Sequence, residues 1–318
     1  MLEHRFAKLA AGATFLLLVI GGTVNPTGSS LACPEPTLVC NGQLFPPMVG
    51  GVLYEHGHRL AAMTVGFLQI ALTILLLRRT ALHGLAWLLL GMVIAQGLLG
   101  AITVQYKLPW FVSTAHLLLG MSYFAMLIYT AFRTRPAPSA LELGRHEKLR
   151  ADLGSARTWI IVAVSAVFIQ LLFGALVRHL GAAMVCLGMP TCTIGSLSLS
   201  GGNWWPDAPV QHLHMIHRAF GVVVGIITTI AAVMVYRRAK AWPQLRLLAL
   251  VAPLLVVAQI ALGIYTVLTM RSVPVAVGHF AGAVSLWALW VAALLLTNRR
   301  QTAVAIAPDR PIALEAVP

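Results

Sequence analysis

Four histidines lie about one or two turns inside apolar segments of helix length, near the same end of the fold: His58, His116, His217 and His279. An imidazole inside such a segment is costly unless something binds it, and ionisable residues there are usually functional. Neutral imidazoles are good ligands for haem iron, and apolar helix walls accept a porphyrin. The pattern predicts two haem sites, each with two axial histidines.

The segments that carry these histidines indicate a membrane protein. Hydrophobic residues make up 59% of the 318-residue chain and charged residues 10%, and the mean hydropathy is +0.85. A soluble core of this size needs less apolar sequence. Eight apolar runs can each cross about 30 Å of hydrocarbon. We expect an all-α polytopic fold with spans at residues 6–24, 55–77, 84–104, 110–131, 158–177, 212–236, 247–267 and 275–297.

The net charge of +13 is explained by basic residues in the loops of this predicted membrane protein. With the N-terminus inside, 17 of the 22 lysines and arginines fall on the cytoplasmic side. This positive-inside bias places both termini on the cytoplasmic side of the membrane and gives no reason to expect nucleic acid as a partner. We expect that membrane to be a bacterial plasma membrane. A cleaved signal peptide is the alternative for residues 6–24, but this run exceeds the usual apolar core of about 7–15 residues.

An internal repeat organises the chain. Residues 58–66 align with residues 217–225, and residues 96–104 with residues 259–267; the second offset also places His116 on His279. We therefore expect two four-helix bundles, residues 1–132 and 158–300, related as a parallel repeat. A charged cytoplasmic linker, residues 133–157, joins them, and residues 301–318 form a tail that is expected to be disordered.

Each predicted bundle offers one histidine from its second helix and one from its fourth, as cofactor sites in bundles often do. Arg59 and Arg218 follow two of the ligands and are candidate partners for haem propionates, although an interfacial arginine can also reach lipid headgroups. Zinc or copper could use histidine pairs too. No third and fourth ligands for a closed zinc site are evident in the sequence.

Four cysteines form two pairs in loops on the extracytoplasmic side. Six residues separate Cys33 from Cys40, and five separate Cys186 from Cys192. Each pair can close a disulfide within its own loop, in a compartment that permits disulfides. A structural staple is favoured for the second pair. For the first pair a structural role and a redox role both stay open.

One carboxylate distinguishes the two halves. Glu55 precedes His58 by three residues and so shares its helix face, whereas the matching position in the second half is His214. A carboxylate in an apolar pocket beside a haem is suited to accept a proton. The alternative is an acid at a helix start, where the helix dipole favours it. We expect the halves to do different work, with Glu55 as the catalytic residue.

These residues together resemble the heme A synthase family over essentially the whole chain. The resemblance depends on Gly28-Ser-Ser-Leu-Ala-Cys33-Pro with Cys40-Asn-Gly42, on Glu55-His-Gly-His58-Arg59 and on the later histidines, with His217-Arg218 and the second cysteine pair. The first cysteine loop lacks a tryptophan often found in the family, which affects only loop detail.

The resemblance implies a function. It implies oxidation of the C8 methyl group of heme O to a formyl group, giving heme A for terminal oxidases. His58 and His116 would hold the substrate haem, and His217 and His279 a permanent haem b. Expected partners are heme O, membrane lipid, the enzyme that makes heme O and an electron acceptor. The competing function is a diheme b-type electron-transfer protein, similar to quinone oxidoreductases, with two permanent haems.

Overall fold

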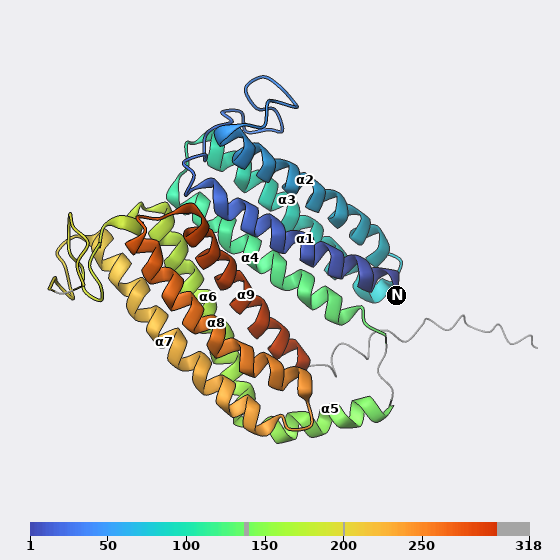
Figure 1. Ribbon diagram of the computed structural model, residues 1–318. Helices are drawn as coiled ribbons and strands as arrows, with labels where there is room; N and C mark the ends of the chain where they lie inside the picture. Colours follow the sequence, from blue (N-terminus) through green and yellow to red (C-terminus); the bar gives the residue numbers. More distant parts are fainter. Residues whose placement is uncertain (137–139, 200, 298–318) are drawn as a thin grey trace, which may run out of the picture.

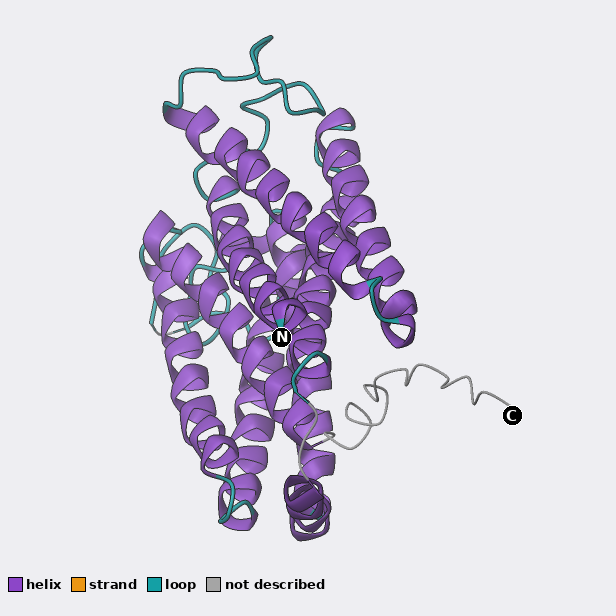
Figure 2. Cartoon of the chain, turned by 90° about the vertical axis from the view of Figure 1, so that its right-hand side faces the viewer, coloured by secondary structure: helices purple, strands orange, loops and turns teal. Residues whose placement is uncertain are grey.

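The computed structural model describes residues 1–136, 140–199 and 201–297, and this part of the chain is helical without β-strands (Figure 2). Within these described residues, eight helices are long and apolar enough to cross a membrane. Their positions confirm all eight predicted spans, with ends that differ by at most five residues. They are α1 (Leu2–Val24), α2 (Gly50–Leu76), α3 (His83–Gln105), α4 (Trp110–Arg133), α6 (Ser155–His179), α7 (Pro209–Arg238), α8 (Pro243–Leu268) and α9 (Val273–Thr297).

Local sequence explains where several helices begin and turn. Helices α7 and α8 start with a proline, whose fixed φ suits the first helical position and whose missing N–H is not needed there. Between α3 and α4 the chain reverses through Lys107 and Leu108, both with positive φ. Met270 and Arg271 do the same between α8 and α9. These tight turns make α4 and α9 antiparallel neighbours of the helices before them.

The spans form two groups of four. Helices α1–α4 pack together, helices α6–α9 pack together, and α1 and α4 meet α6 and α9 at the seam between the groups (Figure 1). Across this seam, Trp287 Nε1 donates a hydrogen bond to the backbone oxygen of Met121, 3.1 Å away. Helices α3 and α8 are the least buried spans, as expected for helices that face lipid. Residues that must be shielded from lipid are therefore expected on the six other spans.

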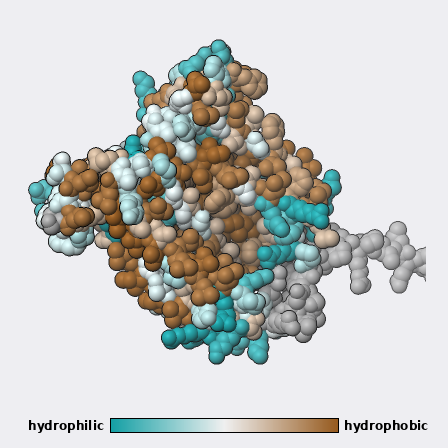
Figure 3. Space-filling model, viewed as in Figure 1, coloured by the Kyte–Doolittle hydropathy of each residue, from teal (hydrophilic) through white to brown (hydrophobic). Residues whose placement is uncertain are grey.

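The two ends of the bundle differ. The loops that carry the cysteines lie at one end, and the N-terminus and helix α5 (Ala140–Leu153) lie at the other (Figure 1). Helix α5 occupies the predicted linker and was not itself predicted. Apolar residues cover the middle of the visible face, and hydrophilic residues gather towards its ends (Figure 3). The chain is thus an integral membrane protein. The predicted disordered tail, residues 301–318, lies outside the described residues.

Candidate functional site

The four histidines lie at matched depths. His58 and His217 are each eight residues beyond the first residue of α2 and α7, and His116 and His279 are each six residues beyond the first residue of α4 and α9. At 1.5 Å per residue these depths are about 12 and 9 Å. All four side chains are partly accessible. They lie about two turns inside their helices, as predicted.

The second pair, His217 and His279, has a geometry that suits a metal. Their ring centroids are 6.5 Å apart and their planes are nearly perpendicular. This spacing leaves room for one metal ion at metal–nitrogen distances of about 2 Å. Nδ1 of His279 lies 3.1 Å from the backbone oxygen of Gln259, whereas neither Nε2 has a hydrogen bond to a described residue. The free nitrogens and the ring spacing fit axial ligation of a haem iron.

Each of the four rings packs against a glycine of the helix that precedes it in the chain. A Cβ placed on these glycines would lie within 3.4 Å of the histidine's Cε1. At Gly21 a Cβ would overlap the ring of His58, at Gly174 and Gly263 it would be tight, and at Gly100 it would make an ordinary contact. The distances from the added Cβ to Cε1 are 2.7 Å for Gly21 and His58, 3.4 Å for Gly100 and His116, 3.3 Å for Gly174 and His217, and 3.2 Å for Gly263 and His279.

Three of these glycines follow a glutamine four residues earlier, and each glutamine side chain donates to the backbone oxygen of the adjacent histidine. The donor–acceptor distances are 2.9–3.0 Å for Gln96 with His116, Gln170 with His217 and Gln259 with His279. On α1 the same position, four residues before Gly21, is Leu17. Only His58 therefore lacks this clamp. The Gln-x-x-x-Gly spacing is visible in the sequence, where its role was missed.

The first pair receives residues from the other half of the chain. His179, at the end of α6, has Nδ1 3.1 Å from Oγ1 of Thr114, two residues before His116. The neighbouring Arg178 donates through Nη2 to the backbone oxygen of Gly21, 3.3 Å away. Neither contact was predicted, because each joins helices that are distant in sequence.

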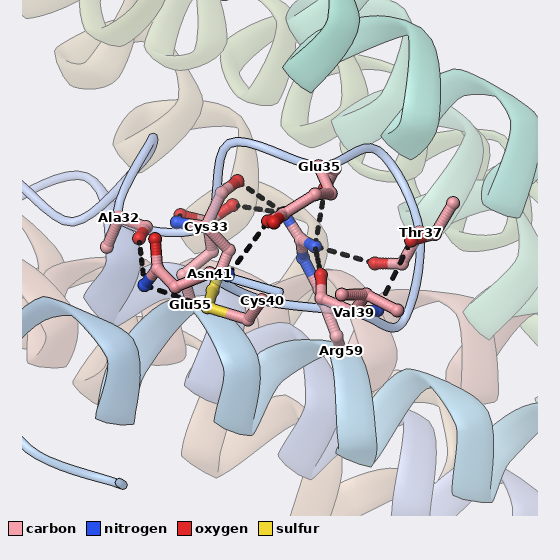
Figure 4. Close-up of polar contacts among 9 residues, drawn as sticks. All are labelled: Ala32, Cys33, Glu35, Thr37, Val39, Cys40, Asn41, Glu55 and Arg59. Atoms are coloured by element: carbon pink, nitrogen blue, oxygen red, sulfur yellow. Dashed lines mark hydrogen bonds and ion pairs between the residues drawn. A yellow bond between two sulfur atoms is a disulfide. The ribbon is translucent and has the colours of Figure 1, made fainter. Parts of the chain in front are cut away.

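Both cysteine pairs form disulfides, Cys33–Cys40 and Cys186–Cys192, as predicted. The arginine beside each ligand histidine fastens one of these loops. Nη1 and Nη2 of Arg59 donate to the backbone oxygens of Cys33, Glu35, Thr37 and Val39 at 2.6–3.1 Å (Figure 4). Arg218 donates to the backbone oxygens of Cys186 and Gly188, both at 2.7 Å. Both guanidinium groups are engaged with loop oxygens, and their predicted propionate role stays a prediction.

Glu55 links the first loop to α2. Its Oε1 accepts a hydrogen bond from Arg59 at 2.7 Å, and its Oε2 accepts the backbone N–H of Cys33 at 2.9 Å (Figure 4). The residue is 5% exposed, as is His214 at the matching position. A buried carboxylate with these partners holds the disulfide loop against the helix that carries His58. Its predicted catalytic role is untested by this geometry.

A second asymmetry concerns the residue under each disulfide. His56 is fully buried beside the Cys33–Cys40 pair, and neither of its ring nitrogens has a hydrogen-bond partner among the described residues. In the second half, Met215 packs with Cys186 and Cys192. With the sulfurs joined as a disulfide they are not thiolate ligands, so this cluster is not a metal site in the oxidised protein.

Within the first cysteine loop, Glu35 has a strongly hydrogen-bonded carboxylate. It accepts the backbone N–H groups of Gly42 at 2.8 Å and Asn41 at 2.9 Å. The hydrogen bond from Gly42 is the main reason that the pKa of Glu35 lies below its ordinary value, and the positive charge of Arg59 acts in the same direction. The ionised carboxylate closes the loop around the disulfide.

The family of the chain follows from comparison with known proteins. The model of the COX15-CtaA family, described as cytochrome oxidase assembly protein, matches residues 4–291. This match covers both histidine pairs and both disulfides. The chain belongs to the heme A synthase family.

Individual members of the heme A synthase family match over most of their length. The heme A synthase of Geobacillus kaustophilus is 28% identical over 312 residues, which are 96% of this chain and 94% of that protein. The heme A synthase of Shouchella clausii is 27% identical over 279 residues, 84% of this chain and 87% of that protein. The heme A synthase of Macrococcus caseolyticus is 26% identical over 311 residues, 94% of this chain and 99% of that protein. The predicted family is confirmed.

Proposed function

We propose that this protein is an oxidoreductase that converts the C8 methyl group of heme O to the formyl group of heme A, for use by terminal oxidases. It would work in a bacterial plasma membrane, with both termini in the cytoplasm. The observation that carries the proposal is a pair of histidine sites at equal depth with unequal surroundings. Glu55 lies beside the first site and His214 occupies the matching position beside the second. Two permanent, equivalent haems would not require this difference.

The hydrogen bonds around the ligands support different roles for the two sites. Gln170 and Gln259 brace both ligand helices of the second site. Partners that orient metal-binding histidines strengthen binding, so this site suits a permanent haem b held by His217 and His279. When bound, that haem would supply an electron relay. In the first site, Leu17 replaces the glutamine beside His58, so His58 is held less firmly, as an exchangeable substrate site requires.

The reaction itself needs water and an electron acceptor. Conversion of a methyl group to a formyl group consumes one water molecule and releases four protons and four electrons. With His58 and His116 on both sides of the substrate iron, oxygen would have to displace an imidazole to bind there. We therefore favour stepwise loss of electrons and protons at the methyl carbon, followed by addition of water. Two such rounds give a hydrated aldehyde, which dehydrates.

Glu55 is the proposed proton acceptor. It is the carboxylate closest in sequence to the proposed ligands, and its two oxygens are bound by Arg59 and by the N–H of Cys33. Taking up a proton would weaken both contacts. Proton transfer would therefore loosen the disulfide loop at the mouth of the first site. The Glu55→Gln variant keeps the shape of the side chain and removes its charge, so we expect it to bind heme O and to convert it at least about 100-fold more slowly.

Pigment extraction tests the proposal directly. Purified protein is supplied with heme O and an electron acceptor, and the extracted haems are separated by chromatography. We expect heme A to appear while haem b stays constant. Haem b alone, with heme O neither bound nor changed, would favour the diheme electron-transfer protein. Formyl oxygen labelled from oxygen gas, under conditions that prevent exchange with water, would contradict the water route and leave the overall conversion intact.

A further inference from the structure

The outer end of α6 places a cation beside the first histidine pair. Arg178 donates to the backbone oxygen of Gly21, and Gly21 is the residue that packs against the ring of His58. Next to it, His179 bonds to Thr114 on the helix that carries His116. Arg178 and His179 thus contact α1 beside His58 and α4 beside His116, although both belong to the second half of the chain.

This cation has no compensating charge among the described residues. The ion pairs in this part of the chain involve Glu3 and Glu55, and neither pairs with Arg178. Nε of Arg178 is buried without a hydrogen-bond partner. A second cation, Arg271, lies within electrostatic range and makes one long contact, 3.5 Å, to Oδ1 of Asn25. Arg178 is half-buried, and a guanidinium that is partly removed from water without an anion is unfavourable, so the seam between the halves is suited to receive negative charge.

Two other arginines at this end of the bundle are already engaged. Arg59 and Arg218 direct their Nη groups at loop oxygens, and Arg59 also pairs with Glu55. In contrast, Arg178 has a single long hydrogen bond of 3.3 Å and retains free donors. A guanidinium with free donors forms strong, directed hydrogen bonds to a carboxylate. The side groups of a haem that carry negative charge are its carboxylates.

We propose that Arg178, supported by Arg271, binds a propionate carboxylate of the haem held by His58 and His116. This inference rests on the proposed function, because it takes the first site to be the substrate site. The first site is then completed by the second half of the chain. Arg178 also lies 5.9 Å from the ring of Phe280, the neighbour of His279. A haem bound in the first site would therefore be linked to the second site through Arg178 and Phe280.

The test compares heme O with its dimethyl ester, in which both propionates are uncharged. Each is titrated into purified protein that retains haem b, and binding is followed by absorption. We expect Arg178→Gln to weaken binding of heme O by about 10- to 100-fold, the worth of one charged hydrogen bond. We expect little change for the ester. Arg178→Lys, which keeps the charge without the fork, should recover part of the loss.

Arg246→Gln is the matched control. Arg246 lies on α8 and also has a buried Nε without a partner, but it contacts Tyr236 far from the histidines. The Arg246→Gln variant should bind heme O and its dimethyl ester as tightly as the unaltered protein does. Equal weakening of heme O and its ester by Arg178→Gln, or no weakening of either, would overturn the proposal.

If Arg178→Gln fails to fold, the same titrations of the unaltered protein provide a second test. It should bind heme O more tightly than the ester, and Arg271→Gln should reduce that preference. Equal affinity for the two haems would overturn the proposal even if conversion to heme A is normal. Preferential binding of heme O without conversion would sustain the proposal and reject the proposed enzymatic function.

Discussion

The contact between Gly21 and His58 gives a quantitative prediction. In Gly21→Ala the new Cβ would lie 2.7 Å from Cε1 of His58. Carbon atoms in contact prefer about 3.5 Å or more, so the ring must retreat by about 0.8 Å. Metal–ligand distances tolerate only about 0.2 Å. Overpacking of this kind costs about 1–3 kcal/mol, which corresponds to about 5- to 140-fold weaker binding of heme O.

The assay is a titration of the purified variant with heme O. Gly12→Ala is the control on the same helix, since a Cβ at Gly12 meets nothing within 4 Å. Gly100→Ala, with a contact of 3.4 Å to His116, should have a smaller effect. Alanine favours a helix more than glycine does, so weaker binding would not reflect loss of helix. Normal binding by Gly21→Ala, or an equal loss in Gly12→Ala, would refute the reasoning.

Three further predictions follow from the same contacts. Gln170→Leu removes the side-chain hydrogen bond to the backbone of His217, and it should release haem b about 10- to 100-fold more readily to an acceptor protein; unchanged release would exclude a bracing role. Arg59→Lys should speed amide exchange in residues 33–43 at least about tenfold, because lysine lacks the planar fork, and Arg218→Lys should act only on residues 186–192; exchange that changes in the wrong loop would contradict this assignment. Because the pKa of Glu35 is depressed, its ionised carboxylate stabilises the first loop at pH values above the ordinary pKa of 4.5, and this stabilisation is lost as the pH falls through the lower pKa of the folded state. The amide signal of Gly42 should follow that titration. A titration that persists in Glu35→Gln would assign it to another group.

Much of the fold could be predicted because its causes are local. Long apolar runs define the spans, and short spacings within each loop define the cysteine pairs. Helix α5 escaped prediction because its sequence is largely charged and its buried apolar face is short, with Leu149 and Leu153 four residues apart. The position of α5 depends on how it packs at the end of the bundle that is predicted to be cytoplasmic. The periodicity of its own sequence does not predict that packing.

The candidate site was predictable only in part. Histidines at matched places in apolar segments stand out, because polar residues there are rare. The glutamine clamps were also readable as a recurring Gln-x-x-x-Gly spacing, although their contact with the histidine backbone was not. Arg178 shows the limit. Its place beside His58 depends on how two distant helices meet, and no pattern near Arg178 in the sequence records that meeting.

The central claim is that each histidine pair holds one haem and that only the first haem is converted. Single alanine variants of His116 and His279, supplied with heme O, test it most directly through their extracted pigments. We predict that His116→Ala keeps haem b and forms no heme A, whereas His279→Ala loses haem b and still binds heme O. Heme A formed normally by His116→Ala, or haem b lost from that variant and kept by His279→Ala, would contradict the account.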